Sequence, residues 1–238
     1  MEAAGYATLS RQTGLMREMR VVANNIANSA TTGFRSEGLI FSEFVQTAPG
    51  QESLSMARAN IFNTSMEQGQ LTQTGGNFDF AIEGDAYFMI ETPLGERLTR
   101  SGAFSPNAAG DLVTMDGHRV LDAGRAPVFI PGTAESVLVG ADGTITADGN
   151  TIGQIGLFQP GEDTTLMRED GVMFRAEGEI VDSENGNMVQ GFLEGSNVNA
   201  ITQVTRMIEI QRAYEMGQSF LETEDQRIRN AIKNLIKS

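Results

Sequence analysis

Histidine, the side chain best suited to acid–base chemistry near neutral pH, occurs once in this chain, as His118. A Ser-His-Asp arrangement could therefore use no other base. His118 follows the turn dipeptide Asp116-Gly117, and nothing nearby in the sequence supplies a nucleophile or a metal partner. We expect an exposed turn residue with no catalytic role.

Asp79, Glu83 and Asp85 form the one close group of carboxylates that invites an enzymatic interpretation. Paired carboxylates hydrolyse glycosidic bonds, which would suit a protein that acts on the cell wall. Acids that alternate along a strand, however, commonly face solvent on the outer side of a sheet. We therefore keep a periplasmic carboxylate enzyme only as an alternative.

Metal and cofactor motifs are missing from the sequence. Asp142 and Asp148 precede glycines, but the calcium-loop pattern of alternating acids closed by a glutamate is absent, and hairpin turns explain both dipeptides. Gly75, Gly76 and Gly110 belong to no phosphate-cradling motif. The chain has no cysteine, which excludes disulfides, thiolate metal sites and cysteine nucleophiles. We expect no catalytic residue, no metal and no cofactor, and interaction becomes the default function.

The net charge of −14 is concentrated in the middle of the chain. Residues 1–35 carry four arginines and two acids, residues 198–238 carry six basic and five acidic residues, and residues 36–197 therefore carry −17. An acidic surface repels phosphate backbones, so we expect no nucleic-acid partner. No apolar stretch approaches the roughly 20 residues that span a bilayer, and the N-terminus lacks the pattern of a cleavable signal. We expect no membrane insertion, and any export must use another route.

A helix over residues 6–28 is the first element that could carry an interaction. Its apolar positions recur at intervals of 7, 3, 4 and 3, which places them on one helical stripe. These positions are Leu9, Met16, Met19, Ala23 and Ile26. The helix should end near Asn28, because Thr31, Thr32 and Gly33 follow and glycine permits the positive φ of a turn out of a helix.

A second helix is predicted from about Ala200 to Lys237. From Met207 onward its seam positions alternate spacings of 3 and 4, the pattern of a helix that buries a narrow seam against another helix. The apolar members of this seam are Met207, Ile210, Tyr214, Leu221, Ile228, Ala231 and Leu235. At about 1.5 Å per residue the helix exceeds roughly 50 Å, so something outside the local core must cover it.

Between the two helices the apolar period shortens and turn dipeptides become frequent. The dipeptides are Asp116-Gly117, Asp142-Gly143, Asp148-Gly149, Asp170-Gly171 and Asn185-Gly186. Such punctuation of short apolar runs predicts an all-β domain built of hairpins, of which Val137 to Thr146 is the clearest. Residues 36–75, rich in Ser, Gln, Thr and Gly, show weaker periodicity, and we interpret them as an extended connector.

Two polar motifs flank the predicted helices. The first is Ala23-Asn24-Asn25-Ile26-Ala27-Asn28 followed by Thr31-Thr32-Gly33-Phe34-Arg35, and the second is Leu193-Glu194-Gly195-Ser196-Asn197-Val198-Asn199 followed by a helix with Gln211-Arg212-Ala213-Tyr214-Glu215. Both resemble the terminal signatures of the flagellar rod and hook protein family. The stretches Ile82–Phe88 and Thr99–Phe104 also resemble the middle domain of that family, so the resemblance runs from end to end.

The signature residues that the resemblance singles out are Asn24, Asn25, Asn28, Thr31, Gly33, Phe34, Gly195 and Asn197. The three asparagines either cap the helix end or bond across subunits, where a buried polar group fixes register. We interpret Gly33 as a backbone requirement and Phe34 as an anchor between the helix and the connector.

The resemblance and the residue patterns together predict an α+β fold. The terminal helices pair as an extended, coiled-coil-like domain, and a mostly antiparallel β domain lies between them in sequence. The expected parts are an assembly helix with its signature turn (1–35), the connector (36–75), the β domain (76–195) and a second assembly helix (196–238). Residues 1–35 and 196–238 would form one discontinuous domain.

The resemblance implies a structural axial subunit of the rod of the flagellar basal body. Such a subunit polymerises through its terminal helices into the tube that transmits torque for motility. Its partners would be copies of itself, other rod proteins and the flagellar type III export apparatus. It would lie in the rod that spans the periplasm, exported without a cleavable signal peptide.

The short connector between Phe44 and Phe80 favours a proximal-rod member over a distal-rod or hook member of this family. Those two members remain alternatives. A third is an adhesin that carries its β domain on a coiled-coil stalk, which should trimerise in isolation through its own helices.

Overall fold

The computed structural model describes residues 2–46, 54–183 and 185–237 and divides the chain into two compact units. The helical unit is formed by Met1–Asn28, Ser36–Ser65 and Val198–Ser238. The β unit is formed by Ser29–Arg35 and Met66–Asn197. Because the chain passes repeatedly from one to the other, both units are discontinuous in sequence.

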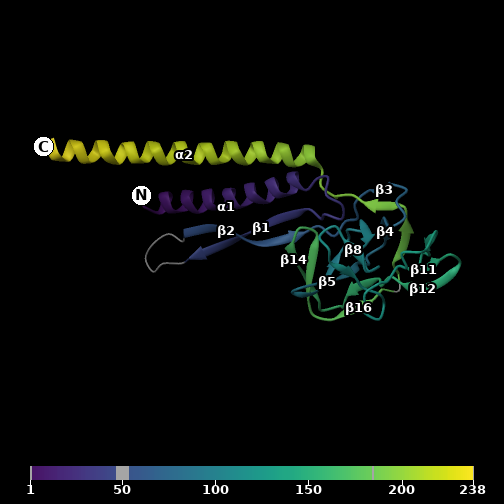
Figure 1. The fold of residues 1–238 in the computed structure, drawn as a ribbon. Helices are drawn as coiled ribbons and strands as arrows, with labels where there is room; N and C mark the ends of the chain where they lie inside the picture. The colour runs from purple at the N-terminus through teal and green to yellow at the C-terminus, as the bar shows by residue number, and fades with distance from the viewer. Residues whose placement is uncertain (1, 47–53, 184, 238) are drawn as a thin grey trace. The chain divides into compact units, whose positions relative to one another are not determined.

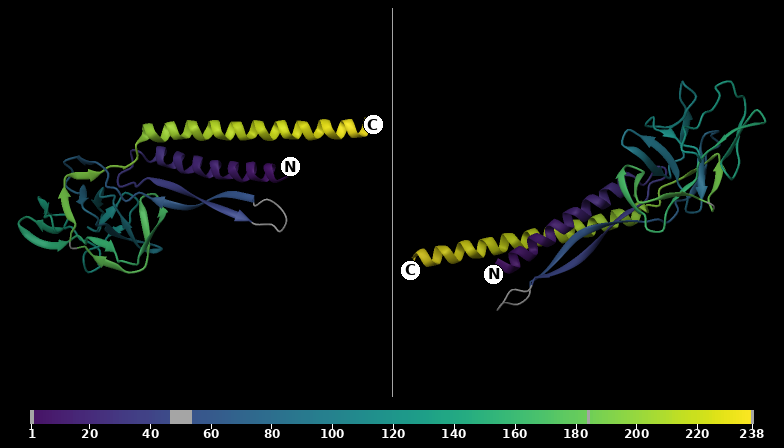
Figure 2. Two further views of the ribbon diagram at one scale, coloured as in Figure 1. Left: turned by 180° about the vertical axis from the view of Figure 1, so that it is seen from behind. Right: turned by 90° about the horizontal axis from the view of Figure 1, so that it is seen from below.

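The helical unit contains two long helices and a two-stranded ribbon. The helices are α1 (Glu2–Ala27) and α2 (Ala200–Lys237), and the ribbon consists of β1 (Glu37–Gln46) and β2 (Leu54–Thr64). In this unit α1 and α2 lie side by side, and the ribbon runs along α1 (Figure 1). Two further views show the same arrangement, with the start of α1 and the end of α2 toward the same end of the unit (Figure 2).

Both helix boundaries next to the signature motifs have a local cause. At the end of α1, the Asn24 carbonyl accepts the Asn28 backbone N–H at 3.0 Å and also the Asn28 side-chain amide at 2.9 Å, and the two bonds together stabilise the last turn. At the start of α2, the Asn199 carboxamide oxygen accepts the Thr202 N–H at 3.1 Å, which is the geometry of an N-cap. The two predicted helices are confirmed, and α1 begins a few residues earlier than its apolar stripe.

The stretch expected to be an extended connector has more order than the sequence pattern suggested. Most of it forms the antiparallel β1–β2 ribbon, whose register runs from the pair Glu37–Thr64 to the pair Gln46–Leu54. The remainder includes a short strand, β3 (Leu71–Gln73). Strand pairing here joins residues far apart in sequence, and the mixed Ser, Gln and Ala composition masks the two-residue period.

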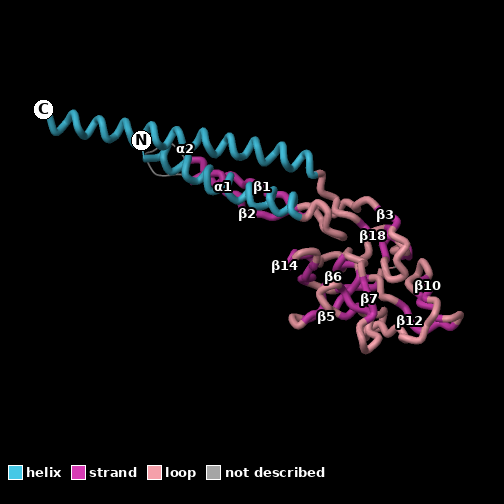
Figure 3. The backbone as a smooth tube through the Cα atoms, turned by 45° about the horizontal axis from the view of Figure 1, so that its top comes forward, coloured by secondary structure: helices cyan, strands magenta, loops and turns pink. Residues whose placement is uncertain are grey.

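The β unit is built entirely from antiparallel pairings among its described strands. A seven-stranded sheet has the order β14-β15-β6-β5-β9-β8-β7, beside the small sheets β10-β11-β12, β13-β16, β17-β4 and β18-β3. The strands of the large sheet are β5 (Phe88–Thr92), β6 (Gly95–Thr99), β7 (Phe104–Pro106), β8 (Leu112–Thr114), β9 (Arg119–Val120), β14 (Thr165–Asp170) and β15 (Met173–Glu177). The others are β4 (Phe80–Glu83), β10 (Val137–Val139), β11 (Thr144–Ala147), β12 (Asn150–Gln154), β13 (Phe158–Pro160), β16 (Ile180–Asp182), β17 (Asn187–Gln190) and β18 (Phe192–Glu194). Figure 3 shows the described part of this unit as strands and loops.

The predicted turn dipeptides mark the junctions of neighbouring strands. Asp142-Gly143 joins β10 to β11, which pair from Val137–Ala147 to Val139–Ile145, so the hairpin predicted over this stretch is confirmed. Asp148-Gly149, Asp116-Gly117 and Asp170-Gly171 similarly separate β11 from β12, β8 from β9 and β14 from β15. The hairpin interpretation of the central region is correct, and the α+β class is confirmed.

Two groups of buried apolar side chains fill the β unit. The larger is built on Phe80, Phe88, Ile90 and Leu112, with Ile145 and Met188 from later strands. The smaller contains Met89 and Phe174 on the other face of the large sheet. Alternating residues of β5 thus serve both groups, which is why the run Phe88-Met89-Ile90 is continuously apolar. The β unit therefore has its own core.

Candidate assembly surfaces

The two terminal helices run antiparallel in the helical unit and are joined by polar contacts near their signature ends. The Glu18 carboxylate accepts the Arg206 Nε–H at 2.7 Å, and the Asn25 amide donates to the Gln203 side-chain oxygen at 3.4 Å. The hydrogen bond to Glu18 raises the pKa of Arg206 above its usual value. Glu18 is buried but the Arg206 side chain is 52% exposed, so solvent screens the pair and we expect it to contribute modestly to stability.

The face of α1 that is buried within the unit differs from the predicted apolar stripe. The buried side chains are Glu18, Val21, Val22 and Asn25. Of the stripe residues, Met19 and Ile26 are half-buried, whereas Leu9, Met16 and Ala23 are exposed. The structure therefore leaves much of the predicted α1 seam facing outward from the chain.

The predicted seam of α2 divides into two parts. Ile210 is buried, and Met207, Tyr214 and Leu221 are half-buried, so these positions are the less exposed ones on the first part of the helix. Further along, Ile228 is 48% exposed and Ala231 is also exposed. The side chain of Leu235 lies outside the described residues.

The length of α2 explains why its last turns are exposed. It has 38 residues against the 26 of α1, so at about 1.5 Å per residue it is longer by roughly 18 Å. The views of the helical unit show α2 continuing past the start of α1 (Figures 1 and 2). The apolar side chains of Ile228 and Ile232, each about half exposed, lie on this part.

A shallow hollow of about 280 Å³ lies between the two helices near the start of α1. Its lining includes Gln12 and Leu15 from α1 and Met216, Gly217 and Phe220 from α2. An added Cβ at Gly217 would lie 3.4 Å from the Gln12 amide nitrogen, which is an ordinary van der Waals contact. Met216 and Phe220 are exposed apolar side chains at its edge.

Asn25 is the signature residue with the most enclosed side chain. It is fully buried, its amide donates to the Glu37 carbonyl at 2.7 Å and its oxygen accepts the Glu37 N–H at 2.9 Å. A carboxamide reproduces the donor and acceptor of a peptide unit, so it pairs with the backbone at the first residue of β1 as a neighbouring strand would. In this chain Asn25 ties α1 to the ribbon.

The other two asparagines of the motif face each other at the end of α1. The Asn28 amide donates to the Asn24 carbonyl and, at 2.8 Å, to the Asn24 side-chain oxygen. Thr31 follows in the turn, where its carbonyl accepts the Phe34 N–H at 3.2 Å. These contacts shape the path of the chain away from α1.

Gly33 and Phe34 occupy an enclosed position in the β unit. Gly33 has a φ of +71°, and a Cβ built there would lie 2.4 Å from the Ser101 backbone nitrogen. Phe34 is 1% exposed, and the Arg168 guanidinium lies over its ring at 4.4 Å from the centroid. Both the positive φ and the close backbone of Ser101 therefore favour glycine over any other residue at position 33.

The second signature motif lies beside the first in the β unit. Asn197 donates its N–H to the Phe34 carbonyl at 3.2 Å and its side-chain amide to the Glu67 carbonyl at 2.8 Å. Gly195 donates its N–H to the Gln70 carbonyl at 2.9 Å. The two motifs, separated by about 160 residues in sequence, are thus held together.

Three buried charged residues, Arg35, Glu194 and Arg100, were not identified as site residues from the sequence. Arg35 and Glu194, each 1% exposed, form an ion pair of 2.8 Å, and Arg100 reaches the other Glu194 oxygen at 3.2 Å. Burial lowers the pKa of Arg35, and the Glu194 carboxylate opposes that shift. Arg35 and Glu194 stand inside the two motifs, but their pairing depends on long-range folding that no local pattern reveals.

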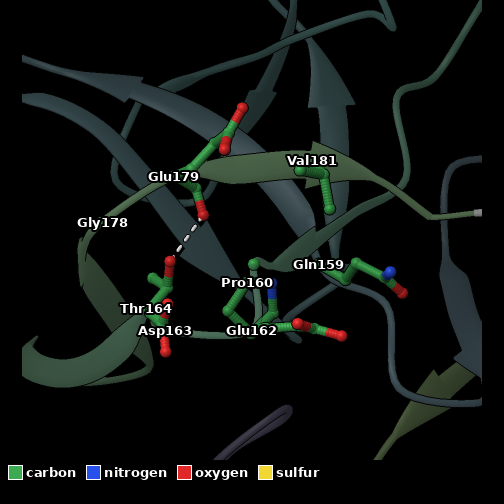
Figure 4. Close-up of a pocket in the computed structure, with 9 residues that line it drawn as sticks. Gln159, Pro160, Glu162, Asp163, Thr164, Gly178, Glu179 and Val181 are labelled. Carbon is green, nitrogen blue, oxygen red and sulfur yellow. Dashed lines mark hydrogen bonds between the residues drawn. The ribbon is translucent and has the colours of Figure 1, made fainter.

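The carboxylates considered for glycoside hydrolysis take other roles. The Asp79 carboxylate accepts the Thr74 hydroxyl at 2.6 Å, and Glu83 and Asp85 are exposed. A hollow of about 510 Å³ elsewhere in the β unit is lined by Glu162, Asp163 and Glu179, among others. Their side chains point apart, and the Thr164 hydroxyl donates to the Glu179 carbonyl at 2.8 Å (Figure 4). This arrangement does not place two carboxylates on opposite sides of one bond.

His118 lies between β8 and β9 and is half-buried rather than exposed as the sequence suggested. It lines a hollow of about 300 Å³ together with Leu94, Arg97 and Glu169. Arg97 is ion-paired with Glu169. Among the described residues, no group of three or more His, Cys, Asp or Glu side chains could hold a metal ion, and no helix is long and apolar enough to cross a membrane.

Exposed apolar positions on paired terminal helices, together with a separate β unit, are typical of structural proteins that assemble through their ends. Comparisons with known proteins agree with this class. Three family descriptions match: "Flagella basal body rod protein" over residues 6–35, "Flagellar hook protein FlgE/F/G D1 domain" over residues 81–147, and "Flagellar basal body rod FlgEFG protein C-terminal" over residues 189–234.

Similar proteins align with this chain over nearly its full length. The flagellar basal-body rod protein FlgF of Mesorhizobium japonicum is 39% identical over 99% of this chain and 98% of its own. FlgF of Caulobacter vibrioides is 36% identical over 100% and 99%, and the rod protein FlgG of Bacillus subtilis is 32% identical over 95% and 97%. The chain belongs to the flagellar basal-body rod protein family. It is a structural rod subunit and not an enzyme, as the resemblance of its motifs predicts.

Proposed function

We propose that this chain is a proximal-rod subunit that polymerises through its helical unit, with copies of itself and with other rod proteins. The observation that carries the proposal is the exposed apolar surface of the terminal helices. Leu9, Met16, Ile228 and Ile232 are 43 to 51% exposed on the two terminal helices. Burying each such side chain in an assembly contributes up to about 1.5–3 kcal/mol, so several together offset the cost of ordering the helices.

The distribution of charge also supports assembly through the helical unit rather than through the β unit. The helical unit contains equal numbers of basic and acidic residues, so the whole net charge of −14 falls on the β unit. Neutral surfaces can approach one another in a polymer without accumulating repulsion, whereas strongly acidic ones stay apart and soluble. We infer that the helical units form the inner layer of the rod and that the β units face outward.

The proximal position is supported by the short stretch between Phe44 and Phe80 and by three relatives named FlgF at 36 to 39% identity, while a fourth, from Salmonella typhimurium, is 29% identical. Relatives named FlgG reach 32 to 34% over slightly less of this chain. A distal-rod or hook position is the alternative. Electron microscopy of basal bodies from cells that lack this protein tests the assignment, because loss of a proximal subunit leaves no rod beyond it, whereas a rod that ends further out would contradict it.

We further propose that the chain is exported unfolded through the flagellar type III apparatus, without a cleavable signal, and adopts its fold in the rod that spans the periplasm. Independence from disulfides fits this route, since the fold stands on packing alone. Mass spectrometry of the subunit from purified basal bodies would show an uncleaved N-terminus. A mature protein lacking its first residues would contradict the proposal.

The substitution Ile228→Asp tests polymerisation through α2. Ile228 is about half exposed in the chain itself, so the substitution should change the free energy of unfolding of the purified protein by no more than about 0.5 kcal/mol. In the assembled rod the same charge would lack water and a partner, at a cost of several kcal/mol per subunit. We expect normal export and melting but no rod and no swimming.

Gln226→Asp is the matched control, because it introduces the same charge two residues away on an exposed, polar part of the same helix. It should leave swimming intact. Normal swimming of Ile228→Asp cells, or equal loss with both variants, would remove the basis for an assembly seam on α2.

A further inference from the structure

The path of the chain between its two units poses a structural problem. The chain crosses from one unit to the other after residues 28, 35, 65 and 197. Three stretches of the β unit border these crossings: 29–35, 66–70 and 194–197. If each stretch were held separately, the helical unit would be attached through several independent linkers.

Glu194 contacts all three stretches. Its backbone carbonyl accepts the Gly33 N–H at 2.7 Å. One carboxylate oxygen accepts the Gly69 N–H at 3.0 Å and pairs with the Arg35 guanidinium at 2.8 Å. The other oxygen pairs with Arg100 at 3.2 Å. Glu194 itself belongs to the third stretch, so one residue joins the first and second stretches to the last.

Neighbouring backbone contacts repeat the connection. The Gly195 N–H donates a hydrogen bond to the Gln70 carbonyl. The Asn197 N–H donates to the Phe34 carbonyl, and the Asn197 side-chain amide donates to the Glu67 carbonyl. The stretch that contains Glu194 therefore lies between the other two and is paired with both.

Arg100 anchors this arrangement to the core of the β unit. Its guanidinium donates to the Ile82 carbonyl at 3.3 Å and to the Gly84 carbonyl at 2.5 Å, and it lies 4.9 Å from the centroid of the Tyr87 ring. Ile82 and Tyr87 belong to the two apolar groups that fill the unit. The Glu194 contacts are consequently fixed to packed strands and not only to one another.

The charges make Glu194 difficult to replace. Its carboxylate lies between two guanidinium groups, and all three side chains are at most 2% exposed. Removing the carboxylate charge leaves two buried cations facing each other without an anion between them, and a buried charge that loses its partner is strongly destabilising. The effect should be largest in the border stretches, because Arg35 and Gly69 contact the Glu194 carboxylate directly.

We propose that Glu194 is a positioning residue for rod assembly. It holds the three border stretches in fixed positions relative to one another, an arrangement that we call the lock. All four chain crossings therefore begin from fixed points on the β unit. The inference rests on assembly through the helical unit, because only then must the β unit present those crossings in one geometry. It adds that force passing between the units is shared by four chain segments rather than carried by one.

Hydrogen exchange of the purified full-length chain tests this lock. In Glu194→Gln, the side chain keeps its size and an acceptor oxygen but loses its charge. Exchange at the amides of Gly33, Gly69 and Gly195 should accelerate at least about tenfold. The amides of Leu121 and Phe158, which pair with backbone carbonyls inside the β unit, should stay within about twofold of the unmodified chain.

Two further variants separate the lock from general stability. Glu91→Gln removes a partly exposed ion pair with Arg119 on the same unit and should leave every amide within about twofold. Arg35→Gln removes the ion pair between Glu194 and the first stretch but keeps the bond of the carboxylate to Gly69, so Gly33 should exchange faster while Gly69 and Gly195 keep their protection. Uniform acceleration of all amides in Glu194→Gln, or no acceleration at the border stretches, would overturn the proposal.

The cellular readout is the yield of basal bodies with complete rods. Glu194→Gln should lower it at least about tenfold at normal subunit export, and Glu91→Gln should not. Complete rods in Glu194→Gln cells whose border amides exchange freely would show that assembly does not need the lock. That result would overturn this inference and leave the proposed rod function standing, because Ile228→Asp tests that function independently.

Discussion

Individual residues of the two signature motifs act mainly on the backbone. Asn25 pairs with both backbone groups of Glu37, and Gly33 turns the chain at a positive φ against the backbone of Ser101. Sequence reasoning identified these residues through their motif and assigned Gly33 a backbone requirement. It could not identify the partners of Asn25, Arg35 or Glu194, because buried polar groups find partners that only the complete fold brings near.

Gly33→Ala should destabilise the β unit by roughly 2–4 kcal/mol, because the new Cβ meets backbone atoms of Arg100 and Ser101 and the φ of +71° is unfavourable for alanine. The measurement is denaturant unfolding of the purified chain. Gly75→Ala is the control, since Gly75 has a similar φ of +74° but open space around an added Cβ. It should cost only about 1 kcal/mol. Equal effects of both substitutions would show that contact with Ser101 is unimportant.

At the scale of elements, the sequence patterns predicted the helices and hairpins better than the ribbon. The 3–4 spacing of α2 and the turn dipeptides of the β unit act over a few residues, and the bounds Ala200–Lys237 agree with the expectation. The β1–β2 ribbon depends instead on pairing between strands whose register is set by each other and by α1. A two-residue period broken by a register shift between Ile40 and Phe41 gives little local signal.

Asn25→Ala should release the start of β1 from α1. The substitution leaves the N–H and carbonyl of Glu37 without the bonds that Asn25 supplies, a loss of about 1–3 kcal/mol. Exchange at the Glu37 amide should rise at least about tenfold. Asn24→Ala, at the adjacent and exposed position, should leave that amide within about twofold. Unchanged exchange in Asn25→Ala would mean that the ribbon is held to α1 by other contacts.

At the scale of the whole chain, stability and assembly surface are divided between the two units. The β unit holds both groups of tightly packed apolar side chains, whereas in α2 Ile210 is the one buried apolar side chain among the described residues. The acidic middle and the nearly neutral ends were visible in the sequence. The sequence also suggested one discontinuous domain made of the two ends. The inclusion of residues 36–65 in that unit was not visible, since it arises from contacts between segments far apart in sequence.

Limited trypsin digestion of the purified subunit measures this division. The side chains of Arg227 and Arg229 on α2 are 58 and 67% exposed, and those of Arg119 and Arg175 in the β unit are 46 and 47% exposed. Access to the side chain alone therefore predicts only a small difference in cleavage. Cleavage also needs local opening of the backbone, which is easier where few apolar contacts hold an element.

We expect cleavage in α2 to be at least about tenfold faster than in the β unit, leaving a resistant fragment from about residue 76 to 195. In intact basal bodies the same α2 sites should be protected, because neighbouring subunits then cover them. If α2 of the isolated subunit resisted trypsin as well as the β unit does, its apolar positions would already be satisfied within the chain. Assembly would then have to proceed through another surface.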